Sequence, residues 1–104
     1  MKRAVLRPSA RAEQHAEVQY YRREAGANVA AKLVRAMSTA LRQLALNPAI
    51  GSPTMGQALG MPGMRIWRLD RFRLSYWYVE REDHLDVVRL VGHGQDPAEI
   101  TVGV

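Results

Sequence analysis

Residues 64–92, MRIWRLDRFRLSYWYVEREDHLDVVRLVG, fix the architecture of this protein more firmly than any other segment. They contain three runs rich in β-branched and aromatic residues, at 64–69, 72–80 and 85–92. Such residues favour strands. Short charged turns separate the runs, Asp70-Arg71 first and Glu82-Asp83 second. Consecutive strands with such short links pair antiparallel, so the segment predicts a sheet of at least three strands.

The middle run carries two different faces, because successive strand residues point to opposite sides of a sheet. One face is apolar and aromatic; it holds Phe72, Leu74, Tyr76 and Tyr78. The other face holds Arg73, Ser75 and Trp77. Neither face is cleanly polar. We therefore expect helices on one face of the sheet and a second face that is partly covered, or used for binding.

The N-terminal half predicts a short strand followed by two helices. Residues 3–7 read as the strand, which Pro8 ends, and Ser9 is the expected N-cap of a helix over about 10–24. In that helix Ala12, Ala16 and Tyr20 share one face, and Gly26 stops it.

A second helix is expected over about 28–46, with Asn28 as its N-cap and Asn47-Pro48 as its end. Its apolar residues recur every three or four positions, as a buried helical face requires. They are Val29, Leu33, Val34, Met37, Leu41 and Leu44. The short link between the two helices predicts an antiparallel hairpin.

Residues 47–63 contain Gly and Pro throughout and no charged residue, so we expect a loop there, and residues 93–104 form a C-terminal tail. The order strand, helix, helix, strand, strand, strand predicts a single α+β domain over residues 1–104. Its N-terminal helical hairpin would pack on a mostly antiparallel twisted sheet.

The composition limits which catalytic groups, metal sites and partners the protein can have. Cysteine is absent, which excludes disulfides, thiolate catalysis and cysteine-ligated zinc. The three histidines lie far apart and no ligand spacing occurs, so no metal and no cofactor is expected. No apolar run approaches the ~18 residues of a membrane span, and a cytoplasmic location is expected. The formal charge of +5 lies mainly in residues 1–46, which suggests either a nucleic acid or an acidic polypeptide as partner.

One set of residues has the chemistry for cleaving RNA. Arg65 and Arg73 could project from neighbouring strands towards His93 at the end of the next. Cleavage needs a base, an acid and cations for the developing phosphorane charge, and His and Arg are the right types. The alternative is that the arginines only solvate a sheet edge and pair with nearby acids. The residues alone favour this second interpretation.

The chain resembles the RelE/ParE toxin superfamily of type II toxin–antitoxin systems, and is closest to its ParE branch. The resemblance rests on the order of elements, Gly63-Met64-Arg65 leading into a strand, and the ending VVRLVGHGQD at 87–96. It spans nearly the whole chain, from Leu6 to Asp96. The family-motif positions are Arg65, Tyr76, Arg89, His93, Gly94 and Asp96.

The resemblance implies a toxin held inactive by a cognate ParD-like antitoxin, whose flexible C-terminal segment wraps it. ParE-like members trap DNA gyrase on cleaved DNA, whereas RelE-like members cut mRNA at the ribosome and typically use basic residues in or near the middle loop. Loop 47–63 has no charge, which favours gyrase inhibition without catalytic residues. Gln95 departs from the Arg that this branch often has before Asp96.

Two alternatives stay open. The first is a ribosome-dependent mRNA endonuclease that uses Arg65, Arg73 and His93. The second is an inactive relic that only binds its antitoxin. Under the gyrase hypothesis, His93 is expected to position the C-terminal turn, through Asp96 or a backbone carbonyl.

Overall fold

The computed structural model describes residues 1–94, 97–100 and 102. Its elements follow the predicted α+β order, with two short helices added. They are β1 (Arg3–Leu6), α1 (Pro8–Ala25), α2 (Ala27–Leu46), α3 (Thr54–Ala58), β2 (Met64–Arg68), β3 (Leu74–Glu80), β4 (His84–Gly92) and the 3-10 helix η1 (Pro97–Glu99). The strands form one sheet in the order β1-β4-β3-β2. β1 pairs parallel with β4, and the other pairs are antiparallel.

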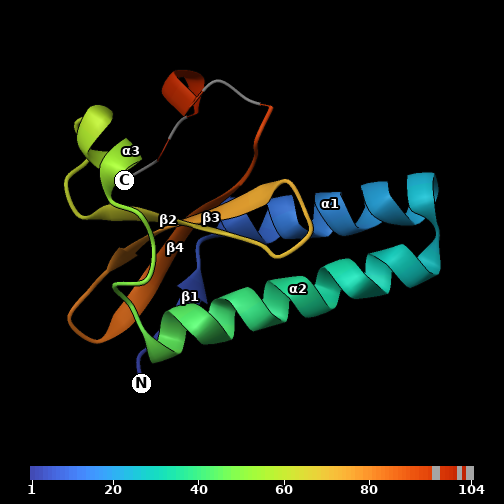
Figure 1. The fold of residues 1–104 in the computed structure, drawn as a ribbon, viewed down its shortest axis with the longest axis horizontal. Helices are drawn as coiled ribbons and strands as arrows, with labels where there is room; N and C mark the ends of the chain where they lie inside the picture. Colours follow the sequence, from blue (N-terminus) through green and yellow to red (C-terminus); the bar gives the residue numbers. More distant parts are fainter. Residues whose placement is uncertain (95–96, 101, 103–104) are drawn as a thin grey trace.

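The helices α1 and α2 form the expected hairpin, which lies along one side of the sheet (Figure 1). Their outer boundaries are close to the prediction, but the predicted caps are wrong. Arg7 occupies the N-cap of α1 and Pro8 its first turn, because proline lacks the N–H that a helix start leaves unpaired. Ser9 lies inside the helix, and its hydroxyl donates to the Val88 carbonyl at 3.1 Å.

Gly26 alone links the two helices. It is the C-cap of α1 and the N-cap of α2, with φ of 92°, a conformation that glycine adopts without strain. Asn28 therefore lies inside α2 and does not cap it. The end of α2 agrees with the prediction, since Asn47 is its C-cap.

Two cores lie on opposite faces of the sheet, as the two-faced middle strand predicted. The helix-side core includes Leu33, Met37 and Leu44 of α2 with Tyr76 and Tyr78 of β3. The second core contains the buried residues Met64, Trp77, Val88 and Val91, and Met55, Leu59, Met61 and Ile100 pack against it. The chain segments around α3 and η1 therefore cover the second face.

Two further expectations were wrong. Loop 47–63 contains α3, and its Ser52 bridges to Ile66 of β2. The strand predicted over 72–80 begins at Leu74, because Arg71 adopts a φ of 68° and the turn extends through Arg73.

The sequence did not show which face of α1 packs on the sheet. Ala12, Ala16 and Tyr20 are exposed, and the inner face instead carries Ala10 and half-buried polar residues such as Glu13 and Gln14. Apolar periodicity could not reveal a face whose contacts are partly polar.

Candidate functional site

His93 lies in the turn that follows β4, beside the second face of the sheet. Its Nε2 is 2.8 Å from the hydroxyl of Ser75, a buried polar residue on β3. Its backbone N–H donates to the Arg73 carbonyl at 3.1 Å. The two contacts attach the turn to the start of β3, so His93 positions backbone through Ser75 and Arg73. Asp96, the partner named in the prediction, lies outside the described residues.

Partial burial lowers the pKa of His93, and the positive charges of Arg68 and Arg73 lower it further. A hydrogen bond from the imidazole to the backbone of Leu74 opposes this effect. The imidazole is therefore neutral at physiological pH, when it has one donor and one acceptor nitrogen. A neutral ring suits a fixed hydrogen bond to the Ser75 hydroxyl.

A small apolar pocket of about 170 Å³ lies beside this pair. Its lining includes Met55 of α3, Trp77 of β3 and Pro97, together with Ser75 and His93. The pocket lies between the second face of the sheet, α3 and η1. Its size and lining fit side-chain packing better than a nucleotide.

Arg65 lies on the opposite face of the sheet from His93. It pairs in register with Tyr78, which belongs to the helix-side core, and cross-strand partners share a face. His93 instead contacts Ser75, which alternates with Tyr76 to the other face. The structure thus brings His93 near Arg68 and Arg73, but it does not bring Arg65 to the same place.

The Arg65 guanidinium is engaged in holding the chain after α2. Its Nη1 donates to the carbonyls of Gly51 at 2.8 Å and Ala49 at 3.3 Å. In the same place the Tyr78 hydroxyl donates to the Pro48 carbonyl at 2.7 Å and accepts from the Gly51 N–H at 2.9 Å. The two side chains anchor residues 48–51 on the sheet.

Two further motif positions, Arg89 and Tyr76, make contacts with α1. Arg89 forms a salt bridge with Glu13 of α1, at 2.6 Å between Nη2 and Oε2. The Tyr76 hydroxyl donates to the Gln14 side chain, and burial raises its pKa. Gly94 lies in the exposed turn after His93.

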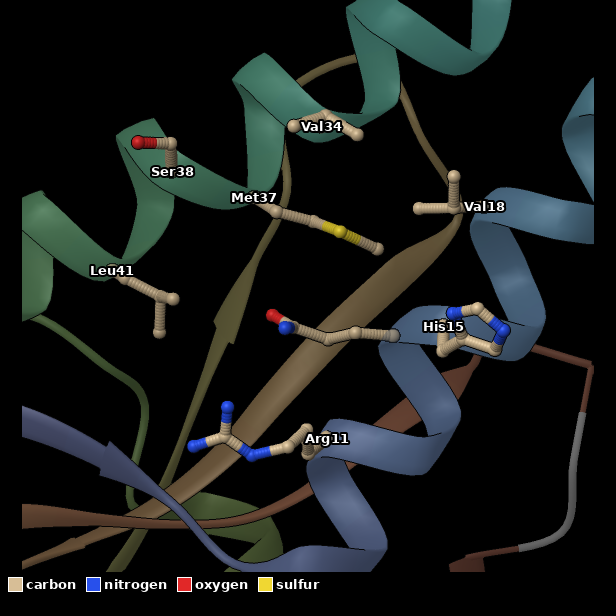
Figure 2. Close-up of a pocket in the computed structure, with 8 residues that line it drawn as sticks. Arg11, His15, Val18, Val34, Met37, Ser38 and Leu41 are labelled. Atoms are coloured by element: carbon tan, nitrogen blue, oxygen red, sulfur yellow. The ribbon is translucent and has the colours of Figure 1, made fainter.

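A larger groove opens between α1 and α2 on the other side of the molecule (Figure 2). It encloses about 460 Å³, and Val18, Val34, Met37 and Leu41 give it apolar walls. Figure 2 shows Met37 reaching from α2 towards α1, and Arg11 extending from α1 along the groove. Val34 is 49% exposed, although it is apolar. Arg11 and His15 also line the groove, and among the residues that the structure describes no acidic side chain does.

In the part of the chain that the structure describes, no three His, Cys, Asp or Glu side chains gather as a metal site would require. Within the same residues, no helix has the length and apolar character needed to cross a membrane.

Comparison with known proteins places the chain in a family. A family model described as "ParE toxin of type II toxin-antitoxin system, parDE" matches residues 4–97. The chain belongs to the ParE toxin family. A search of curated proteins found no match.

The fold agrees with this membership. A solved structure described as "Chromosomal ParDE TA system from P. aeruginosa" matches with a TM-score of 0.73 at 21% sequence identity, over 88% of this chain and 96% of that one. The match over residues 4–97 confirms the ParE resemblance predicted from the sequence. The description of the family as the toxin of a type II toxin–antitoxin system implies an antitoxin partner.

Sequence reasoning missed three polar residues that organise this ParE-family chain: Ser75, Glu13 and Gln14. A signal existed for Ser75, which is a lone small hydroxyl residue in an otherwise apolar and aromatic run. Glu13 and Gln14 had no comparable signal, because their partners lie 62 or more positions away along the chain.

Proposed function

We propose that this ParE-family chain inhibits DNA gyrase in the cytoplasm and is neutralised by a cognate ParD-like antitoxin. The observation that carries the gyrase target is the separation of Arg65 from His93 on opposite faces of the sheet. General acid–base cleavage of RNA needs its catalytic groups within hydrogen-bond reach of one phosphate. A toxin that acts by binding its target has no such requirement.

The two hydrogen bonds that Arg65 donates to backbone carbonyls support the same proposal. A guanidinium that already donates to Gly51 and Ala49 would have to leave the loop unanchored in order to bind a phosphorane. His93 is likewise held by Ser75. These residues are therefore assigned to positioning roles, with no catalytic residue among them.

The test is a supercoiling assay with purified toxin, gyrase, ATP and relaxed plasmid. Inhibition of supercoiling together with accumulation of cleaved DNA is expected. The Arg65→Lys and His93→Gln variants are expected to retain inhibition if they remain folded. Unchanged supercoiling at a large excess of folded toxin would contradict the proposal.

Two further measurements separate the alternatives. Primer extension on translated mRNA would reveal a ribosome-dependent endonuclease, and loss of cleavage in an Arg65→Ala or His93→Ala variant that folds would assign it to the predicted trio. Growth of a host that expresses the chain alone would distinguish a relic, because an active toxin arrests growth and a relic does not.

The groove between α1 and α2 is the surface that we assign to the antitoxin. An amphipathic helix can bury its apolar side against Met37 and Val34, while acidic residues on it face Arg11 and His15. A Val34→Asp variant is expected to weaken capture of the antitoxin at least roughly tenfold, since it places a charge against an apolar partner. Ala12→Asp, on the exposed face of α1, is the matched control.

A further inference from the structure

One long segment of this chain carries positive charge with no acidic residue to compensate it. Residues 25–69 contain five Lys and Arg residues and no Asp or Glu, so they carry +5, the formal net charge of the whole chain. They span α2, α3 and β2. Such a long acid-free segment gives one region of the surface a positive potential.

Four cations of this region and its following turn gather between α2 and the β2–β3 turn. Lys32 and Arg35 of α2 line one crevice with Arg71, and Arg68 lines the neighbouring crevice with Arg71. The crevices enclose about 480 and 500 Å³ and share Thr39, Asp70 and Arg71. We name the continuous surface of Lys32, Arg35, Arg68 and Arg71 the basic strip.

Few carboxylates within the protein neutralise the positive charge of the basic strip. Among the described residues, no salt bridge reaches Lys32, Arg35 or Arg68. Arg71 lies 3.9 Å from Asp70, but their side chains are 88% and 87% exposed, so this pair is weak. Arg7, Arg81 and Arg89, by contrast, each meet a carboxylate within 3.0 Å. The strip thus retains its charge for an external anion.

The backbone at Arg71 is also unusual. Its φ of 68° lies in the left-handed region, which non-glycine residues adopt only when their surroundings impose it. The turn places Arg71 on the wall of both crevices.

The shape and chemistry of the strip favour a polyanion over a peptide. Apolar side chains such as Val29, Trp67 and Phe72 also line the crevices, but the strip has three cations without a salt bridge among the described residues. The groove assigned to the antitoxin lies on the opposite flank of α2, and its lining shares no residue with the strip. Lys32 and Arg35 are nearly one helical turn apart, about 5 Å along the axis. That spacing suits contacts to successive phosphates, which need only cations and no base readout.

We propose that the basic strip binds the phosphate backbone of duplex DNA. The inference rests on the proposed function, since a toxin acting on gyrase meets the DNA that the enzyme holds. The strip contacts that DNA while the groove stays free, so antitoxin and DNA occupy different flanks of α2.

Fluorescence anisotropy with the full chain and a short labelled duplex of random sequence tests the proposal without gyrase. Four phosphate contacts predict a slope of log K against log salt of about −3.6. The variant Lys32→Gln/Arg35→Gln/Arg68→Gln/Arg71→Gln is expected to bind at least roughly tenfold more weakly, with most of the slope lost. Binding by this variant with an unchanged slope, or no binding by the wild type, would overturn the proposal.

A matched control removes exposed cations elsewhere. Arg22→Gln/Arg23→Gln, at the end of α1, is expected to change the salt slope less than the pair Lys32→Gln/Arg35→Gln, which removes the same charge. Equal losses would mean that net charge and not the strip governs binding. Circular dichroism of each variant establishes that the fold is retained.

Two further outcomes keep this proposal separate from the proposed function. If the strip variant loses antitoxin binding and keeps DNA binding, the strip is an antitoxin surface and the DNA proposal is wrong. If the wild type binds DNA through the strip but does not inhibit gyrase, the proposed gyrase target is wrong and the proposal that the strip binds DNA is retained. If the wild type inhibits gyrase and the strip variant binds DNA as tightly as the wild type, the gyrase target stands and only the proposal that the strip binds DNA is wrong.

Discussion

Glu13 of α1 holds two consecutive residues of β4: its carboxylate accepts from the Arg89 guanidinium at 2.6 Å and from the Leu90 backbone N–H at 3.1 Å. β1 pairs with β4 only as far as Val87. Beyond that point Ser9 and Glu13 supply the hydrogen bonds that a neighbouring strand would otherwise make. The first half of α1 therefore covers the exposed edge of the central strand, which protects it from pairing with other chains.

Glu13→Gln is expected to lower the free energy of unfolding by about 1–3 kcal/mol, because Arg89 loses a charged partner in a site where both side chains are about three-quarters covered. Urea denaturation measures the change. Glu24→Gln, which removes an exposed carboxylate at the end of α1, is the control and is expected to have little effect. Equal stability of Glu13→Gln and wild type would show that Arg89 is satisfied without Glu13.

Tyr78→Phe is expected to cost about 1–3 kcal/mol, since the lost hydroxyl leaves the buried Gly51 N–H without its acceptor. The loop after α2 is expected to exchange its amide hydrogens faster, which mass spectrometry can follow. Tyr20→Phe removes a hydroxyl from a side chain that is 51% exposed and serves as the control. Unchanged exchange over residues 48–51 would contradict the anchoring role.

Gly56→Ala is expected to destabilise the protein by about 1–3 kcal/mol through overpacking. A Cβ at this position would lie 2.4 Å from the Met64 carbonyl oxygen and 2.9 Å from that of Met61, both backbone atoms that cannot move aside easily. Gly92→Ala meets nothing within 4 Å and is the matched control. Thermal denaturation distinguishes them, and similar melting temperatures would mean that α3 can shift off the sheet at little cost.

Protonation of Asp86 at low pH is expected to lower the free energy of unfolding. Hydrogen bonds from Arg7 and then Arg81 lower its pKa, so its contribution is fully present above its ordinary value of 3.8 and is lost as pH falls through the lower folded value. Asp86→Asn is expected to be less stable than wild type by about 1–3 kcal/mol at neutral pH. The difference should shrink below about pH 4, as protonation removes the wild-type charge.

The control for this pH dependence is Asp70→Asn, whose side chain is 87% exposed. Urea denaturation at several pH values measures both variants. A difference between wild type and Asp86→Asn that stays constant down to pH 2 would show that the charge of Asp86 contributes nothing.

Titration of the histidine ring signals by NMR tests the environment of His93. Its pKa is expected to lie below the ordinary value of 6.5, because burial and the charges of Arg68 and Arg73 disfavour protonation. Arg68→Gln removes one of these charges and is expected to raise the His93 pKa, whereas Arg42→Gln on α2 should leave it in place. A His93 pKa at or above 6.5 in the wild type would contradict the geometry of the turn.

The alternation in residues 72–80 predicted a sheet with two different covered faces, and the two cores confirm it. The period of α2 likewise predicted the burial of Leu33, Met37 and Leu44, but it wrongly included Val34, which is 49% exposed. Both predictions succeed because the periodic positions of these elements are apolar on the side that meets the core. The inner face of α1 could not be predicted in this way, because it contacts β3 and β4 partly through Gln14 and Glu13, and polar contacts weaken the apolar period.

The candidate site shows the same division. The sequence identified Arg65, Arg73 and His93 as the residues with suitable chemistry, but spacing along the chain does not determine which face of a sheet a side chain occupies across strands. Strand register places Arg65 with Tyr78 and His93 with Ser75. A one-residue change of register would move a side chain to the other face, so only the paired sheet decides whether such residues meet.

By itself the sequence determined the order of the elements, the hairpin of α1 and α2, the ParE resemblance and the excess of positive charge in residues 1–46. These follow from local periodicity, from turn residues and from charges that can be counted along the chain. The tertiary structure decided which arginines are bound to carboxylates or carbonyls and which remain open to a partner. That distinction depends on contacts between residues far apart in sequence, such as Arg89 with Glu13, and only the folded chain brings those residues together.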